Sequence, residues 1–197
     1  KNVLYFHTFA NTYIHPFGNG SYPEEPDLTT HREIGEEMAR HNDYFVGTCL
    51  ESIFYTVNGD ASDWSYGEAG LISFAPEVGS YSAHFWPSEN DVEELCSSQV
   101  YPNTIFSVVA GSDIIVHSYE LSEDFLAPGS ENEIEITVQN RGLSNSNGDI
   151  EISFEPLNNW ISLDNEHFTI SEIDARDSDD VTLVFTVSPN ALSLIHI

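Results

Sequence analysis

The chain has 197 residues, which is room for one large domain or two small ones. Hydrophobic residues make up 40% of it and aromatic residues 12%, enough to build packed cores and to exclude a chain that is disordered throughout. Thirty-three acidic residues against five basic ones give a formal net charge of -28, which repels nucleic acid and anionic membranes. We therefore expect no nucleic-acid partner and no membrane insertion, and we interpret the charge as the solvated acidic shell of a secreted, extracellular protein.

The first part of the chain, residues 1–112, mixes strand and helix signals. The apolar segments Val3–Phe9 and Leu71–Ala75 are typical of buried strands. Ser88 precedes a run that has the pattern of a helix start. Strands that alternate with helices predict an α/β layer built on a sheet.

A longer helix is predicted between these two strands. Thr30 and Glu33 have the spacing of a capping box, which favours a helix from about Thr30 to Phe45. Three of its residues lie at helical spacing and are expected on the core face: Ile34, Met38 and His41.

The pattern changes near Asp113, where apolar and polar residues begin to alternate with a period of two. Clusters of turn residues separate these runs, which predicts an all-β sandwich over residues 113–190 and a domain boundary after Ser112. The five runs begin at Ile114, Ile134, Ile150, Phe168 and Val181. The last segment, residues 191–197, ends in Leu-Ser-Leu-Ile-His-Ile, which resembles a translated sequencing adapter, so we expect it to be a non-native tail.

The two cysteines, Cys49 and Cys96, are 47 positions apart. This spacing matches neither a zinc knuckle nor a redox pair. Two interpretations stay open: one disulfide in an exported protein, or two buried thiols.

Three segments of residues 1–112 carry chemistry when they are taken together. The first is Phe6–Phe9 with Tyr13–Gly18, the second is Tyr55–Glu68, and the third is Ser73–Gly79 with Phe85–Pro87 beyond it. In order and spacing they resemble the zinc metallocarboxypeptidase family of the carboxypeptidase A and B type. The resemblance implies an α/β fold of mixed sheet and helices, and it implies hydrolysis of the C-terminal peptide bond of peptides and proteins.

The resemblance also implies roles for single residues. His7 would be the third ligand of one Zn²⁺ ion, and Glu77 would be the general base that takes a proton from the attacking water. The family's other two ligands come from an upstream His-x-x-Glu motif that this sequence does not contain. The chain is therefore expected to be the C-terminal part of a catalytic domain, inactive by itself.

The substrate pocket is assigned on the same ground. Tyr55 would close over the substrate's C-terminus, while Ser62 with Leu50, Val57 and Ala75 would line the pocket for the terminal side chain. Because Ser62 is neutral and its companions are apolar, neutral or hydrophobic terminal residues are favoured, unless Asp60 or Asp63 points inward.

Residues 113–190 resemble the immunoglobulin-like domains appended to secreted bacterial peptidases, which implies a spacer or attachment role. This leaves a second hypothesis, in which an inactive peptidase-like part and a sandwich serve as a secreted binding or adhesion module. The presence of His7, Tyr55 and Glu77 together favours the enzyme.

Overall fold

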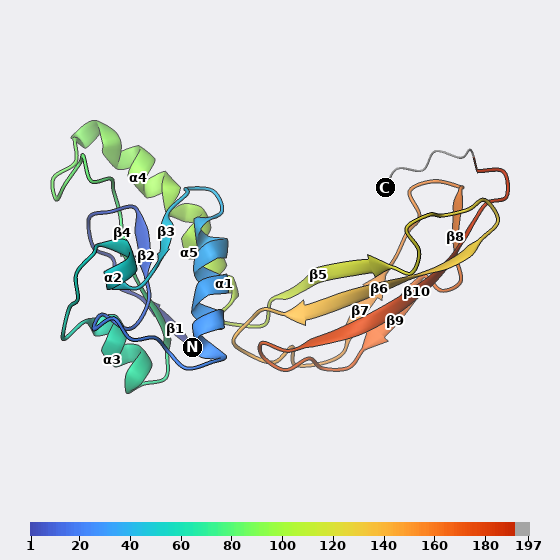
Figure 1. Cartoon of the computed structure of the whole chain (residues 1–197), viewed down its shortest axis with the longest axis horizontal. Coiled ribbons are helices and arrows are strands. Elements are labelled where there is room, and N and C mark those ends of the chain that lie inside the picture. Colours follow the sequence, from blue (N-terminus) through green and yellow to red (C-terminus); the bar gives the residue numbers. More distant parts are fainter. Residues whose placement is uncertain (192–197) are drawn as a thin grey trace. The chain divides into compact units, whose positions relative to one another are not determined.

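The computed structural model describes residues 1–191. The chain forms two compact units, Lys1–Ala110 and a second that starts at Gly111, close to the predicted boundary after Ser112 (Figure 1). Residues 192–197, most of the expected tail, lie outside the described residues. No helix within residues 1–191 is long and apolar enough to cross a membrane.

The first unit is built on a four-stranded mixed sheet with the order β1-β4-β2-β3. Strand β4 is parallel to β1 and antiparallel to β2, and β2 is parallel to β3. The strands are β1 (Asn2–Leu4), β2 (Thr12–Ile14), β3 (Phe45–Gly47) and β4 (Ile72–Glu77). All six residues of β4 except the last are buried, which confirms the prediction of a buried strand there.

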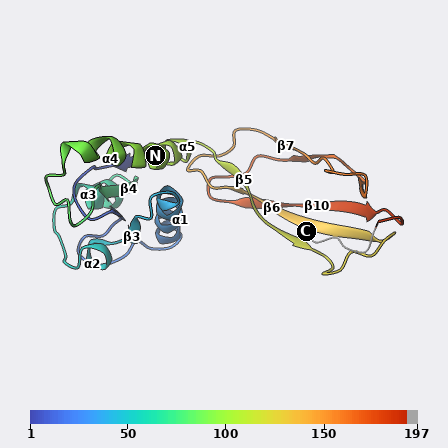
Figure 2. The same cartoon turned by 90° about the horizontal axis from the view of Figure 1, so that it is seen from above.

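Helices cover both faces of this sheet. Helices α1 (Asp27–Ala39) and α5 (Val100–Val108) lie on one side, and α2 (Cys49–Ser52) and α3 (Ala61–Gly67) on the other (Figures 1 and 2). Gly35 allows α1 to approach closely, because a Cβ atom there would lie 2.5 Å from Val46 and 3.1 Å from Phe74. The sheet is therefore buried on both faces, as is usual for strands that run parallel.

The predicted start and end of α1 are wrong. The helix begins at Asp27 and ends at Ala39, and its N-cap is Pro26, without a side-chain cap. The Thr30 hydroxyl lies inside the first turn and donates to the Pro26 carbonyl oxygen. Ile34 and Met38 are fully buried as predicted, but His41 lies beyond the helix and is exposed.

A capping box does occur at the start of α2. The Thr48 side chain accepts from the Glu51 N–H, and the Glu51 carboxylate accepts from the Thr48 N–H at 2.8 Å. Ser88 caps a short 3-10 helix, η1 (Glu89–Asp91), which leads into α4 (Val92–Ser98), so the predicted helix start there is confirmed. Both cysteines are free; Cys49 is buried at the start of α2, and Cys96 is exposed on α4.

The second unit consists of two antiparallel sheets. One has the order β5-β6-β10-β8 and the other pairs β7 with β9. The strands are β5 (Ile114–Leu121), β6 (Glu131–Asn140), β7 (Ile150–Ser153), β8 (Ile161–Leu163), β9 (His167–Ile170) and β10 (Ser178–Val187). All five predicted runs form strands, whereas β8 was not predicted, because its three residues carry too short a pattern.

The two sheets of this unit pack on each other through their apolar faces. Ile136 and Val138 of β6 and Val181 and Leu183 of β10 are buried. The partly buried Ile150, Ile152 and Phe168 of the β7–β9 sheet pack against them. Seen from above, β7 lies in a layer separate from β6 and β10 (Figure 2). The alternation of apolar and polar residues thus marks which face of each strand is buried.

Candidate functional site

The site begins where two neighbouring strand segments end. Glu77 is the last residue of β4, and His7, beyond β1, forms an isolated parallel bridge with it. The His7 N–H donates to the Pro76 carbonyl at 2.9 Å, and the Val78 N–H donates to the His7 carbonyl at 3.0 Å. Backbone hydrogen bonds on both sides therefore fix two residues that lie 70 positions apart in sequence.

The side chains of this pair face each other. His7 Nδ1 lies 3.2 Å from Glu77 Oε2, and the side chains of His7 and Glu77 are 65% and 14% exposed. Burial raises the pKa of the Glu77 carboxyl above its usual value, the hydrogen bond and charge of His7 oppose this, and the charge of Asp60 adds to it. A carboxyl group with a raised pKa holds its proton more strongly than an ordinary carboxyl group does.

Aromatic rings border the pair on one side. Phe9 makes edge contacts with the rings of Tyr81, His84 and Phe85 at centroid distances of 5.0–5.4 Å. The His7 ring lies 6.5 Å from that of Phe85. Phe9 and Phe85 belong to the motif segments of the sequence, but the sequence assigned no site role to these rings. The density of aromatic residues between positions 81 and 86 was the available signal, but it did not show which surface they cover.

A hollow of about 620 Å³ opens beside His7. Residues of the His7 segment, of the end of β4 and of α4 and α5 line it: Phe6, His7, Thr8, Val78, Leu95, Cys96, Gln99 and Asn103. Its walls are largely apolar, and it reaches the exposed imidazole. It gives the site room for a bound group next to His7.

The predicted pocket residues occupy different places. Ala75 belongs to a buried apolar cluster with Ile14 and Cys49, and Val57 packs against that cluster. Leu50 is 47% exposed and Tyr55 59% exposed. Both side chains are therefore open to a ligand.

Ser62 lies in the interior, 1% exposed. Its hydroxyl donates to Asp60 Oδ1 at 2.8 Å, and its N–H donates to the same oxygen at 2.7 Å. Asp60 thereby caps α3, and the Ser62 hydroxyl is directed to the start of its own helix. The role of Ser62 in a substrate pocket stays a prediction.

Asp63 joins two loops near the site. Both oxygens of its carboxylate accept from the Gly18 N–H, at 2.9 and 3.0 Å. The Gly18 carbonyl in turn accepts from the Val57 N–H at 2.9 Å. Gly18 is needed here, because an added Cβ would lie 2.5 Å from the Val57 side chain. Asp63 therefore holds the segment that leads to Tyr55, a role that its N-terminal position in α3 did not reveal.

The described residues do not form a complete metal centre. Within residues 1–191, no group of three or more His, Cys, Asp or Glu side chains could hold a metal ion. A catalytic zinc ion takes three protein ligands and keeps one open position. An imidazole nitrogen of His7 is of a type that could take one of these positions, and the other two would need donors from outside the described residues.

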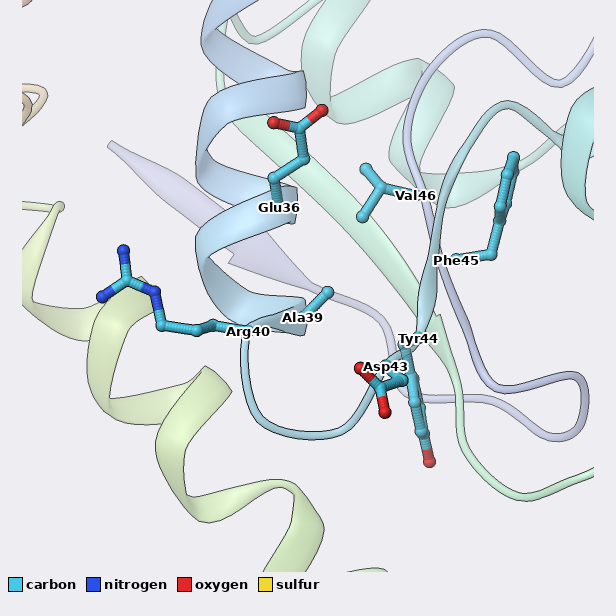
Figure 3. A pocket seen from close by; sticks show the side chains of 7 residues that line it. All are labelled: Glu36, Ala39, Arg40, Asp43, Tyr44, Phe45 and Val46. Carbon is cyan, nitrogen blue, oxygen red and sulfur yellow. The ribbon is translucent and has the colours of Figure 1, made fainter.

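A second hollow lies away from this site, between the end of α1 and strand β3. It measures about 440 Å³ and is lined by Glu36, Ala39, Arg40, Asp43, Tyr44, Phe45 and Val46 (Figure 3). The sticks show acidic and basic groups around its rim and no predicted site residue. Arg40, the C-cap residue of α1, forms an ion pair with Glu37 of that helix.

No protein-family model and no curated protein matches the chain. Among solved structures, the chain is similar to bovine thrombin-activatable fibrinolysis inhibitor in a complex with tick carboxypeptidase inhibitor. The match has a TM-score of 0.47 and 18% sequence identity, and it covers 55% of this chain and 38% of that one. The chain thus spans well under two thirds of the structure that it matches.

Proposed function

We propose that this chain contributes the catalytic base, one zinc ligand and part of the substrate pocket to a metallocarboxypeptidase. The observation that carries the proposal is the contact of His7 Nδ1 with Glu77 Oε2 at the adjoining ends of two parallel segments. The motif resemblance of residues 6–87 supports it, because the two residues in contact are those that the resemblance names.

The proposal gives the predicted site residues separate tasks. Glu77 accepts a proton from the attacking water and passes it to the leaving amine, and its raised pKa supports both steps. Tyr55, exposed on its loop, contacts the substrate's C-terminus. The cluster around Ala75 and Val57, with Leu50 at its rim, receives the terminal side chain.

A zinc ion, when bound, would lower the pKa of a water molecule to about 7 and polarise the peptide carbonyl. His7 would hold it by one nitrogen, and Glu77 at 3.2 Å would orient the imidazole until the ion binds. The remaining ligands belong, in this proposal, to a segment outside the chain. The whole enzyme, its peptide substrates and an extracellular location are thus part of the proposal.

The second unit has a separate part in the proposal. Its antiparallel sheets pack through a core of their own, and the sequence resembles appended immunoglobulin-like domains. We assign it a role in spacing or attachment rather than in catalysis.

The test uses the complete polypeptide that carries this chain, with release of the C-terminal residue from a set of peptides as the readout. Glu77→Gln should lower kcat by at least about 100-fold, the usual contribution of general acid–base catalysis, while zinc stays bound. The control is Glu89→Gln, which changes an exposed carboxylate on η1. Normal turnover by Glu77→Gln would overturn the base assignment. A wild-type polypeptide that binds peptides without cleaving them would favour the adhesion module.

A further inference from the structure

Two histidines outside the candidate site lie deep inside the first unit. His15 directly follows β2, and His31 lies on α1, facing β4. Both are 0% exposed, and their ring centroids are 5.7 Å apart. Buried imidazoles are neutral when nothing pairs with the charged form, so each must find partners for one donor and one acceptor nitrogen.

The hydrogen bonds of His31 determine its protonation state. Its Nδ1 lies 2.8 Å from the Asp27 carbonyl oxygen, which can only accept, so Nδ1 carries the proton. Its Nε2 accepts from the Ser73 backbone N–H on β4 at 3.4 Å. A proton on Nε2 would point at the N–H group of Ser73, and the hydrogen bond between His31 of α1 and Ser73 of β4 would be lost.

His15 is constrained in a similar way. Its Nδ1 lies 2.8 Å from the Pro16 carbonyl oxygen, so this nitrogen is also the donor. Its Nε2 is buried and has no hydrogen-bond partner among the described residues. A second proton there would place a charged donor in the interior with nothing to accept from it, which is costly.

The charged groups around the pair do not offset that cost. Glu51 on α2 attracts a charged His15, but its oxygens already accept from Thr48 and Tyr22. Arg32 on α1 repels a charged His15, and the two histidines repel each other. Asp27 on α1 favours a charged His31, and the Tyr66 ring on α3 lies against His31.

The direction of the resulting pKa shifts agrees with this geometry. Burial lowers the pKa of His31 to about 4, although the hydrogen bond to Asp27 opposes the shift. Burial likewise lowers the pKa of His15.

We propose that His15 and His31 form an acid-sensitive lock on the packing of α1, β2 and β4: both buried rings must be uncharged in the closed state, so mildly acidic solution favours an opened state that binds the protons. The lock bears on the candidate site, because Ser73 and Glu77 lie on the same strand. His15 lies at the head of the segment that Asp63 holds at Gly18. Acid would therefore loosen both strands before most carboxylates are protonated.

The experiment follows the whole chain by NMR between pH 7.5 and pH 5. The ring ¹⁵N shifts should show His15 and His31 as neutral Nδ1–H tautomers that take no proton in the folded state down to pH 5.5. Over the same range, the opening constant obtained from hydrogen exchange of the Ser73 amide should rise. For His31 alone the rise from pH 7.5 to pH 5.5 is about tenfold, because the opened state binds a proton with a pKa near 6.5.

Two variants complete the test. His31→Asn retains a donor near Asp27 but cannot titrate. In this variant the opening constant of the Ser73 amide should rise about tenfold less between pH 7.5 and pH 5.5 than in the wild type. His117→Asn, at an exposed bulge of β5, should leave it unchanged. If His31→Asn does not fold, the wild-type measurement still decides. Titration of either buried ring near pH 6.5 in the folded chain, or an opening constant that does not change with pH, would overturn the proposal.

Discussion

The carboxyl group of Glu77 has been placed where its charge is unfavourable. It is mostly buried, its pKa is raised, and Asp60 adds a repulsive charge. Among the effects on its pKa, only the hydrogen bond and the charge of His7 favour the charged form. A charged group held in this way raises the free energy of the folded state, and such groups are enriched at functional sites.

This argument predicts that Glu77→Gln stabilises the chain at pH 7.5, by about 1 kcal/mol. Since the folded-state pKa is raised, the charged carboxyl costs stability above that pKa, and the cost disappears as the pH falls through it. Urea unfolding of both forms at pH 7.5 and at pH 4 measures the difference. A variant that unfolds at a lower urea concentration at pH 7.5 would contradict the prediction.

In the second unit, Asn140 is a buried polar residue whose hydrogen bonds are all satisfied. It is fully buried, and its amide donates to carbonyls of Ser144, Ile173 and Asp174, at 2.8–3.2 Å. Its Oδ1 accepts from the N–H groups of Asp113 and Gly142. One side chain thus satisfies backbone groups from three segments.

We predict that Asn140→Ala destabilises the second unit by at least about 3 kcal/mol, because several buried backbone groups lose their partner at once. Chemical denaturation followed by hydrogen exchange of β6 and β10 amides would measure the effect. Asn190→Ala, on an exposed turn, is the matched control and should change stability by less than about 0.5 kcal/mol. Similar losses of stability in both variants would show that the hydrogen bonds of Asn140 do not stabilise the second unit.

At the scale of elements, the short helix α3 holds neighbouring segments through side chains at its N-terminus. Asp60 caps it, and Asp63 reaches out of it to Gly18. Burial raises the pKa of Asp63, the Gly18 hydrogen bond opposes that shift, and the charge of Asp60 adds to it. The helix thereby ties the Gly18 loop to the Val57 segment.

Replacing Asp63 with Ala should therefore destabilise the first unit by about 1–3 kcal/mol and free the loop that carries Tyr55. Asp63→Asn keeps an oxygen acceptor for the Gly18 N–H and should retain most of the stability. Thermal unfolding and limited proteolysis between positions 16 and 60 report the two effects. Equal losses in the Ala and Asn variants would mean that charge, not the hydrogen bond, is what matters.

At the scale of the whole molecule, the net charge of -28 dominates the electrostatics. The described ion pairs are few; the clearest joins Arg141 to Asp113 within the second unit at 2.8 Å. Most carboxylates therefore repel one another through solvent, and salt screens that repulsion.

We expect an increase from 0.05 to 0.5 M NaCl to raise the melting temperature of each unit by about 5 °C, which corresponds to roughly 1 kcal/mol for a unit of about 100 residues. Scanning calorimetry at constant pH measures the shift. A melting temperature that does not change with salt would show that the acidic groups are too widely spaced to interact.

The donor set also predicts how the chain responds to zinc. One imidazole does not make a catalytic site, so calorimetric titration of the 197-residue chain should show no tight stoichiometric binding. His7→Ala should give the same titration curve. Sub-micromolar binding that His7→Ala abolishes would show that the chain completes the site with its own residues.

The sequence by itself determined what depends on local patterning. The buried strand around Phe74, the core positions Ile34 and Met38, and the alternating strands of the second unit all follow from period and polarity. The motif order also brought out His7 and Glu77, although not their contact. Local rules failed where two signals compete over a few residues. Thr30 has the spacing of a cap, yet the preceding turn extends the helix back to Asp27.

Only the tertiary structure decided which distant groups meet. Three contacts join segments that lie 16 to 70 positions apart: His7 with Glu77, Asp63 with Gly18, and His15 with His31. The contact of His7 with Glu77 follows from the pairing of β1 with β4, which sequence spacing does not encode. Burial then changes the chemistry: removal from water raises the pKa of Glu77 and lowers that of His31, and composition alone predicts neither.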